Sequence, residues 1–247
     1  MPNNEIVFGI HAVQSLCKSA PQRIVELCVS QSRHDHKLKK IIDAAQKQSI
    51  HIKNLDKKAM DELCEGNHQG VIAVVTPGKS FSEHDLYPLL ESLPTTCQIL
   101  VLDGVTDPHN LGACLRSADA AGVSAVVIPK DNSVGLTEVA RKVACGAADT
   151  VPLVPVTNLA RAIKKMQELG FWVTGLAGEA EQDVYEADLT GRRVLVMGAE
   201  GSGLRRLTRE TCDGLVKIPM KGSVSSLNVS VATGIVLFET LRQNQSN

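Results

Sequence analysis

The sequence predicts an α/β protein: a mostly parallel sheet with helices on both faces, preceded by a smaller α/β domain. From residue 98 onward, short apolar segments such as 99–102 and 125–128 alternate with segments of helical periodicity. Strands that lack polar alternation are typical of parallel sheets buried on both faces. The 247 residues are 43% hydrophobic, which is enough for a sizeable core. A stretch of weak periodicity between residues 77 and 96 separates the two predicted domains.

Residues 1–76 form the first predicted domain. Ile10, Val13, Leu16 and Cys17 recur at helical spacing, which predicts a helix with one buried face. In chain order the predicted elements are a strand at 5–8, a helix at 9–18, a strand at 23–29, a helix at 35–48, a strand at 50–53, a helix at 57–64 and a strand at 71–75.

Basic residues are in excess in this first part of the chain. Residues 1–79 contain 11 Lys and Arg against 8 Asp and Glu. The lysines at its centre are Lys37, Lys39, Lys40, Lys47, Lys53, Lys57 and Lys58. Two interpretations are open, a solvated helix face or an auxiliary domain that contacts phosphates.

Residues 77–96 are predicted to be a linker with one short helix near 85–92, because Pro77, Gly78 and Pro94 interrupt the pattern. The second domain then spans residues 97–247. Its predicted strands lie at 99–102, 125–128, 151–154, 171–174, 194–197 and 215–218, and its predicted helices at 111–121, 136–145 and 158–169.

A last helix begins at Asn228. Leu227, Val231, Ile235 and Phe238 follow one another at helical spacing, so we expect this helix to be largely buried through them.

Composition excludes several classes of protein. The net charge of −1 provides no overall electrostatic field that would attract a polyanion. Aromatic residues make up only 3%, which disfavours a surface that reads bases by stacking. The seven cysteines are scattered without a CxxC pair, which predicts reduced thiols and neither disulfides nor a metal site. The N-terminus lacks the pattern of a signal peptide, and no apolar run approaches the roughly 20 residues of a membrane span. We expect a soluble, cytoplasmic protein without membrane contact.

In a parallel sheet, ligands bind beyond the carboxyl ends of the strands. This rule selects three loops, at 103–110, 198–203 and 220–228. In the first, Asn110 can cap the following helix, on which Arg116 lies among small apolar residues. An arginine in such surroundings needs an anion or acceptor, and a structural salt bridge with Asp103 or Asp119 is the alternative.

The second loop disfavours an enzyme that binds a dinucleotide cofactor. The glycines after strand 194–197 have the order G-x-x-G-x-G, which is wrong for a dinucleotide fingerprint, and Glu200 would repel a pyrophosphate. A Rossmann-type dehydrogenase is therefore disfavoured, although a plain glycine-rich turn with a solvated Glu200 stays open. The third loop consists of small polar residues that leave backbone groups accessible to a ligand.

Together, the three loops resemble the SpoU (TrmH-type) branch of the SPOUT RNA methyltransferases. The matching motifs are Asn110-x-Gly112-x-x-x-Arg116, then 197–204 with Glu200 at its centre, then 218–232 with the run from Ser225 to Ala232. They cover residues 98–243. Residues 9–13 and 68–71 resemble the small substrate-binding domain of the same family.

This resemblance implies a C-terminal trefoil knot, an L30e-like first domain and a homodimer. It implies S-adenosylmethionine as cofactor and transfer of its methyl group to a ribose 2′-hydroxyl in RNA. A guanosine of 23S ribosomal RNA is the expected target, and transfer RNA is the alternative. Carried over by position, the cofactor-binding residues would be Leu176, Ala177, Gly178, Met197, Gly198, Ile218, Met220 and Leu227.

The same resemblance implies Arg116 as the base that activates the hydroxyl. Because the pKa of arginine exceeds about 12, we favour Arg116 as an anchor for the adjacent phosphate and a stabiliser of the developing alkoxide, with base action as the alternative. Asn110, Glu200, Ser226 and Asn228 would orient Arg116 and the ribose. For Asn228, a helix N-cap is an equal alternative. An RNA-binding module without catalysis is the competing class of protein.

Overall fold

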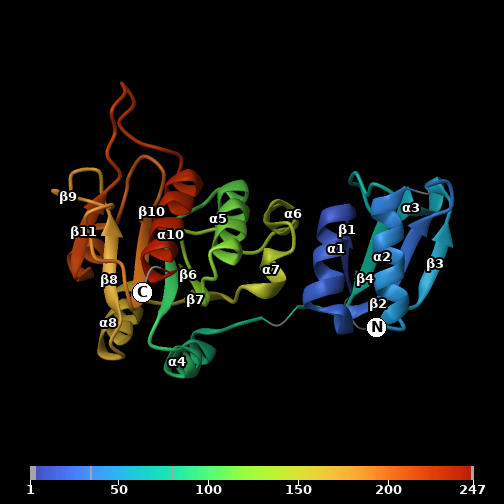
Figure 1. Cartoon of the computed structure of the whole chain (residues 1–247), viewed down its shortest axis with the longest axis horizontal. Coiled ribbons are helices and arrows are strands. Elements are labelled where there is room, and N and C mark those ends of the chain that lie inside the picture. The colour runs from blue at the N-terminus through green and yellow to red at the C-terminus, as the bar shows by residue number, and fades with distance from the viewer. Residues whose placement is uncertain (1–3, 34, 79, 246–247) are drawn as a thin grey trace. The chain divides into compact units, whose positions relative to one another are not determined.

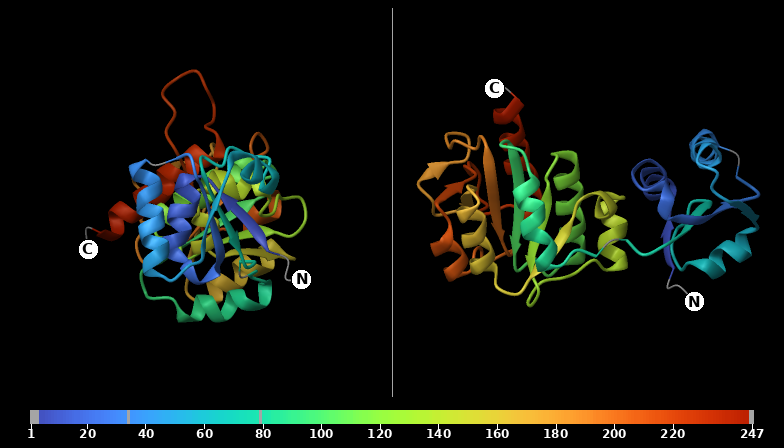
Figure 2. Two further views of the ribbon diagram at one scale, coloured as in Figure 1. Left: turned by 90° about the vertical axis from the view of Figure 1, so that its right-hand side faces the viewer. Right: turned by 90° about the horizontal axis from the view of Figure 1, so that it is seen from below.

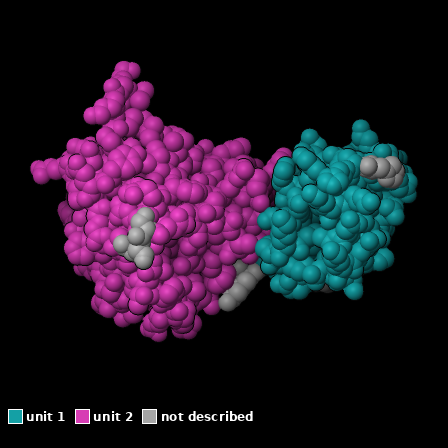
Figure 3. Space-filling view, viewed as in Figure 1, with its two compact units in different colours: residues 1–79 teal, residues 80–247 magenta. Residues whose placement is uncertain are grey.

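A computed structural model describes residues 4–33, 35–78 and 80–245 of the chain. The outermost residues of the two predicted domains, and Lys79 of the predicted linker, lie outside these ranges. The chain divides into two compact units, Met1–Lys79 and Ser80–Asn247 (Figure 3).

The first unit is a four-stranded sheet with helices. Its elements are β1 (Glu5–Phe8), α1 (Ile10–Ser19), η1 (Pro21–Arg23), β2 (Ile24–Ser30), α2 (His36–Lys47), β3 (Ile52–Leu55), α3 (Lys57–Leu63) and β4 (Val71–Val75). The strand order is β1-β4-β2-β3, with β4 antiparallel to both neighbours and β3 parallel to β2. Ile10, Val13, Leu16 and Cys17 are buried in its core, as their spacing predicts.

The second unit contains a seven-stranded parallel sheet. Its elements are α4 (Glu83–Ser92), β5 (Cys97–Asp103), α5 (Pro108–Ala120), β6 (Ala125–Pro129), α6 (Glu138–Ala144), α7 (Ala147–Thr150), β7 (Leu153–Val156), α8 (Leu159–Glu168), β8 (Trp172–Leu176), β9 (Gln182–Asp183), β10 (Arg192–Gly198), α9 (Arg206–Thr211), β11 (Gly214–Lys217) and α10 (Val229–Gln245). The strand order is β7-β6-β5-β10-β8-β11-β9, and every pair is parallel.

Helices cover both faces of this sheet (Figures 1 and 2). One core lies between the sheet and helices α5 and α10, and the other between the sheet and helices α4 and α8. The predicted α/β class with a mostly parallel sheet is confirmed, because strands buried on both faces carry apolar residues throughout.

The segment expected to be a linker is partly built into the second unit. Leu86 and Leu90 of α4 are fully buried in the core that α4 shares with α8. Ser82 caps α4 with Asp85, whose side chain accepts hydrogen bonds from the Ser82 backbone N–H and hydroxyl. Only part of 77–96 therefore connects the units.

The buried face of α10 differs from the predicted one. Val229, Thr233, Val236, Leu237 and Thr240 face the core. Val231 and Phe238 are instead 51% and 48% exposed, and Leu227 and Ile235 are half-buried. The helix has two apolar faces, and helical spacing alone does not distinguish the one that packs on α5 and β10.

Candidate functional site

The carboxyl ends of four adjacent strands gather the predicted loops at one edge of the sheet. Asp103 at the end of β5 is in register with Gly198 at the end of β10. β8 lies on the other side of β10, and β11 lies beside β8. Because all four strands are parallel, the loops that follow them leave the sheet at the same edge.

The loop after β10 closes on itself. Ala199 and Gly203 exchange backbone hydrogen bonds of 3.1 and 2.9 Å. A Cβ atom on Gly198 would lie 2.1 Å from the carbonyl carbon of Gly203, so only glycine allows this closure. Gly201 and Gly203 have φ angles of 82° and 65°, in the region that favours glycine. The turn places Glu200 at its exposed tip.

A buried ion pair fixes the base of this loop. Asp103 is fully buried and accepts hydrogen bonds from the backbone N–H of Arg205, at 3.0 Å, and from its guanidinium. A buried carboxylate requires such partners. The end of β5 and the end of the Glu200 loop are therefore tied together.

Three of the five predicted catalytic residues form one hydrogen-bonded network. The Asn110 amide donates to Glu200 Oε2 at 3.2 Å. The Asn228 amide donates to Asn110 Oδ1 at 3.0 Å and to Glu200 Oε1 at 3.3 Å. Each residue follows a different strand, so the network joins all three predicted loops. Each carboxylate oxygen of Glu200 accepts one of these hydrogen bonds, which fixes the carboxylate plane.

Asn228 is also the N-cap of α10. Its Oδ1 accepts hydrogen bonds from the Ser230 backbone N–H at 2.9 Å and from the Ser230 hydroxyl at 2.6 Å. The two interpretations of Asn228, a helix cap and a site residue, are thus compatible, because the amide oxygen serves the cap and the amide nitrogen serves the network.

Arg116 lies outside this network. It is exposed on α5, and Nη1 contacts the Cys145 sulfur at 3.7 Å. The alternative of a salt bridge with Asp103 or Asp119 is wrong, because neither carboxylate lies within ion-pair distance of Arg116. Asp103 binds Arg205 instead, and Asp119 accepts a hydrogen bond from the Thr150 hydroxyl. Within the described ranges, no carboxylate forms an ion pair with Arg116, so its charge is available to an anion.

Ser226 is likewise apart from the network. It lies at the end of the segment from Lys221 to Ser226, in which every residue is exposed. In Figure 1 the orange-red connection between β11 and α10 projects away from the sheet. Ser226 is therefore connected to the edge of the sheet by the chain itself, through Asn228 two residues further along.

The predicted cofactor residues surround the same edge but differ in burial. Leu176, Ala177, Gly198, Ile218, Met220 and Leu227 are half-buried, and Gly178 is exposed. Met197 is 3% exposed and packs in the core, so only its backbone is left at the edge. Half-buried apolar side chains beside accessible backbone suit a ligand with an apolar, hydrogen-bonding ring system.

Sequence reasoning overlooked two residues at this site. Arg205 lies next to the glycine motif, where its charge could have indicated a partner for Asp103. Cys145 lies 29 residues from Arg116, and no local pattern joins them. Cys145 adopts a left-handed conformation with φ 53° at the end of α6, which is rare outside glycine and asparagine.

All seven cysteines are free, and burial raises the pKa of the Cys114 thiol to about 11. Across the ranges given above, no cluster of three or more His, Cys, Asp or Glu could hold a metal ion. No helix of the described chain is long and apolar enough to cross a membrane.

Comparison with known proteins adds independent evidence. Residues 98–238 match the model described as SpoU rRNA Methylase family, and residues 6–81 match the model described as RNA 2'-O ribose methyltransferase substrate binding. The chain is 57% identical over 247 residues to the 23S rRNA (guanosine-2'-O-)-methyltransferase RlmB of Shewanella oneidensis, with 100% of both chains covered. It is 56% identical over 245 residues to the protein of that name from Pseudomonas putida, with 99% of each covered.

Solved structures share the fold. The SpoU methyltransferase AviRb from Streptomyces viridochromogenes, in complex with the cofactor AdoMet, gives a TM-score of 0.77 at 22% identity, covering 99% of this chain and 92% of that one. These matches confirm the resemblance drawn from the three loops, and the chain belongs to the SpoU rRNA methylase family.

Proposed function

We propose that this protein transfers a methyl group from S-adenosylmethionine to the ribose 2′-hydroxyl of a guanosine in 23S ribosomal RNA. The observation that carries the proposal is identity of 56–57% over the whole chain to two proteins named for that reaction. The network of Asn110, Glu200 and Asn228 at the carboxyl edge of the sheet supports it.

The cofactor is proposed to bind at this edge. Bound there, S-adenosylmethionine supplies an electrophilic sulfonium methyl group. Leu176, Ile218 and Leu227 offer half-buried apolar side chains, and the open space over Gly178 leaves room beside the backbone. Ala177, Met220 and Gly198 complete the set, and Met197 contributes its backbone.

In the transfer, the hydroxyl oxygen would bond to the methyl carbon while the bond from that carbon to the cofactor sulfur breaks, and the hydroxyl proton would pass to water. In our proposal Glu200, held by two amides, orients the ribose, and Arg116 binds the neighbouring phosphate and stabilises the developing alkoxide. An unpaired guanidinium suits this electrostatic role better than that of a base. Ser226 is proposed to approach the ribose when the exposed connection before Asn228 closes over bound RNA.

Ribose methylation mapped by mass spectrometry tests the function. An in vitro 23S rRNA transcript is incubated with protein and S-adenosylmethionine, and we expect one modified guanosine. Methylation of transfer RNA but not of this transcript would favour the transfer RNA alternative. Calorimetry with S-adenosylmethionine addresses the other class of protein, since an RNA-binding module without a cofactor site gives no binding heat.

We further propose that the first unit is an L30e-like RNA-binding domain. The match of residues 6–81 to a substrate-binding model and the excess of basic residues support this role. A ribosomal RNA substrate also implies a cytoplasmic location.

A trefoil knot is proposed for the C-terminal part of the chain. β10 inserts between two strands that precede it in sequence, β5 and β8. The chain then returns from β11 across the carboxyl ends of β8 and β10 to reach α5 through α10. Single-molecule stretching tests the proposal, because a tightened knot shortens the fully extended chain, and an extension equal to the contour length of 247 residues would contradict it.

A homodimer is proposed to form through the outward face of α10. Val231 and Phe238 are about half exposed there, with Ile235 between them. Such a contiguous apolar face is typical of an interface. We expect Phe238→Asp to sediment as a monomer while wild type sediments as a dimer, and a monomeric wild type would refute the proposal.

A further inference from the structure

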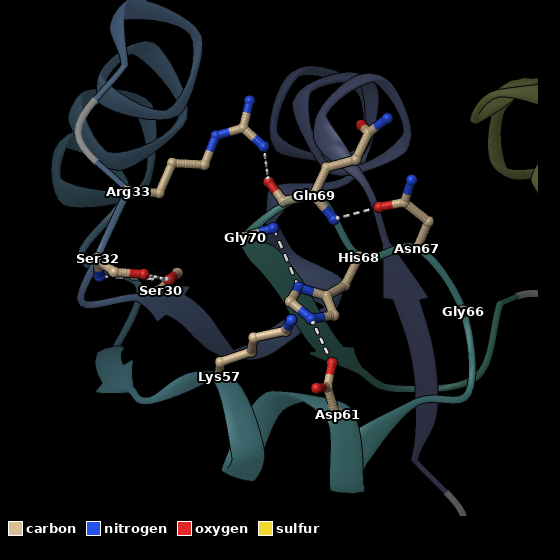
Figure 4. A pocket seen from close by; sticks show the side chains of 10 residues that line it. All are labelled: Ser30, Ser32, Arg33, Lys57, Asp61, Gly66, Asn67, His68, Gln69 and Gly70. Atoms are coloured by element: carbon tan, nitrogen blue, oxygen red, sulfur yellow. Dashed lines mark hydrogen bonds and ion pairs between the residues drawn. The ribbon is translucent and has the colours of Figure 1, made fainter.

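The first unit contains a polar pocket that the methyl-transfer chemistry does not use. It has a volume of about 310 Å³ and lies where β2 ends and β4 begins (Figure 4). Its lining residues are Ser30, Ser32, Arg33, Lys57, Asp61, Gly66, Asn67, His68, Gln69 and Gly70. Figure 4 shows Arg33 at the upper edge of this group and Lys57 below the Ser30–Ser32 segment.

A tight turn at 68–70 forms the floor of this pocket. Gln69 and Gly70 have φ angles of 49° and 78°. The Gln69 side chain accepts the Ile10 backbone N–H at 3.1 Å and so caps α1. A Cβ atom on Gly70 would lie 2.8 Å from Arg33 Cδ, so glycine lets the arginine cross the turn. Contacts among the protein's own residues therefore form the floor of the pocket.

Two hydrogen bonds hold the His68 ring in place within this floor. Its Nδ1 accepts the Gly70 backbone N–H at 3.0 Å, so the ring proton is on Nε2, which donates to Asp61 at 3.0 Å. Asp61 is the only carboxylate among the lining residues, and this bond engages its Oδ1.

The groups left over at the pocket are mainly hydrogen-bond donors. Arg33 donates from Nη1 to the Gln69 carbonyl at 2.5 Å and from Nε to Asp35, which leaves Nη2 unused. Lys57 has no ion pair with any described residue. Two hydroxyls, Ser30 and Ser32, lie 3.1 Å apart beside them. Two cations and two hydroxyls match an anion with several oxygens.

We propose that this pocket binds a phosphodiester group of the RNA substrate, through Lys57, Arg33 Nη2 and the two hydroxyls. The proposal rests on the proposed function, which supplies RNA as the polyanion. It assigns the pocket a positioning role, because phosphate contacts fix the register of a nucleic acid without reading its sequence.

Lys57→Gln in the full chain provides the cleanest test. Lys57 is exposed at the first turn of α3 and holds no other described group, so its replacement should leave the fold unchanged. Lys47→Gln is the matched control, because Lys47 is an equally exposed lysine in the last turn of α2, at the far end of that helix from Asp35. Lys57→Arg keeps the charge and should retain binding.

Binding to an in vitro 23S rRNA transcript is measured at several salt concentrations. Losing one phosphate contact should weaken binding about threefold to tenfold at low salt and reduce the slope of log K against log salt by about 0.7 to 0.9. Lys47→Gln should retain the wild-type slope, or lose less than half as much. Equal affinity and slope for Lys57→Gln and Lys47→Gln would overturn the proposal, as would weaker binding with an unchanged slope.

The source of the phosphate and the proposed function are tested separately. If guanosine monophosphate binds wild type but not Lys57→Gln and leaves the transcript bound, the pocket binds free nucleotides and the proposal fails. Displacement of the transcript from wild type through Lys57 supports the proposal. If wild type binds the transcript but methylates no ribose, the proposed function fails while the Lys57 comparison still decides the pocket. If wild type binds no RNA, both fail.

Discussion

Asn228 combines a helix cap with a site contact, and two substitutions separate these roles. Asn228→Ala removes the acceptor for the Ser230 backbone N–H and the donor to Asn110 and Glu200. Asn228→Ser keeps a good capping hydroxyl but is too short to reach the network. The pair therefore distinguishes stability from activity.

The magnitudes follow from the contacts. Loss of an N-cap costs about 1 kcal/mol of unfolding free energy, so Asn228→Ala should be destabilised by about that amount and Asn228→Ser by less than about 0.5 kcal/mol. The contact of the amide with the Glu200 carboxylate is charge-assisted but exposed, and we take about 1.5 kcal/mol for it. Both variants should then lose about tenfold in kcat/KM.

Urea unfolding and single-turnover methylation of the rRNA transcript measure the two effects. Wild-type kcat/KM in Asn228→Ser would refute a role for the network, and Asn228 would be a cap alone. Equal stability of Asn228→Ala and wild type would refute the cap instead.

Three further predictions concern the frame around the site. Gly112→Ala should lower the unfolding free energy by about 1–2 kcal/mol despite the better helix propensity of alanine, because its Cβ would lie 2.6 Å from a backbone oxygen of α6. Gly135→Ala, with open space around it, is the control in urea unfolding. A stabilised Gly112→Ala would contradict the packing argument. Burial raises the pKa of Cys114 to about 11, and partial burial together with Asp213 and Asp103 raises that of Cys212 to about 12. At pH 8 iodoacetamide should therefore leave both unmodified in the native protein, and rapid labelling of either would contradict its raised pKa. The hydrogen bond from the Thr157 backbone N–H lowers the pKa of Glu83 in the folded protein. The stability that this contact adds is therefore complete above the unfolded pKa near 4.5 and is lost as the pH falls through the lower folded pKa. The stability advantage of wild type over Glu83→Gln should shrink on acidification, and an advantage that stays constant with pH would count against this contact.

Much of the fold is encoded locally. Apolar strands and helical spacing predict most elements of both units to within a few residues, since each buried strand needs only its own run of apolar side chains. The short elements η1, α7, β9 and α9 were not predicted, because two to six residues are too few to show a period. The same local patterns place Asn110, Glu200 and Asn228 after strand ends. The rule for parallel sheets then brings them to one edge, where the structure joins them by hydrogen bonds.

Packing decided which apolar residues face the core. α10 is apolar on two sides, and its contacts with α5 and β10 determine that Val236 and Leu237 are buried while Val231 and Phe238 are exposed. The helical spacing of apolar residues predicts that a helix has an apolar face but does not predict which partner covers that face.

The sequence by itself determined the family, the α/β class and the three loops that form the site. Only the tertiary structure decided the partners of the charged groups: Asp103 binds Arg205, 102 residues away, and no carboxylate of the described residues pairs with Arg116. Ion pairs depend on the distance between side chains from separate elements, and no local periodicity encodes that distance.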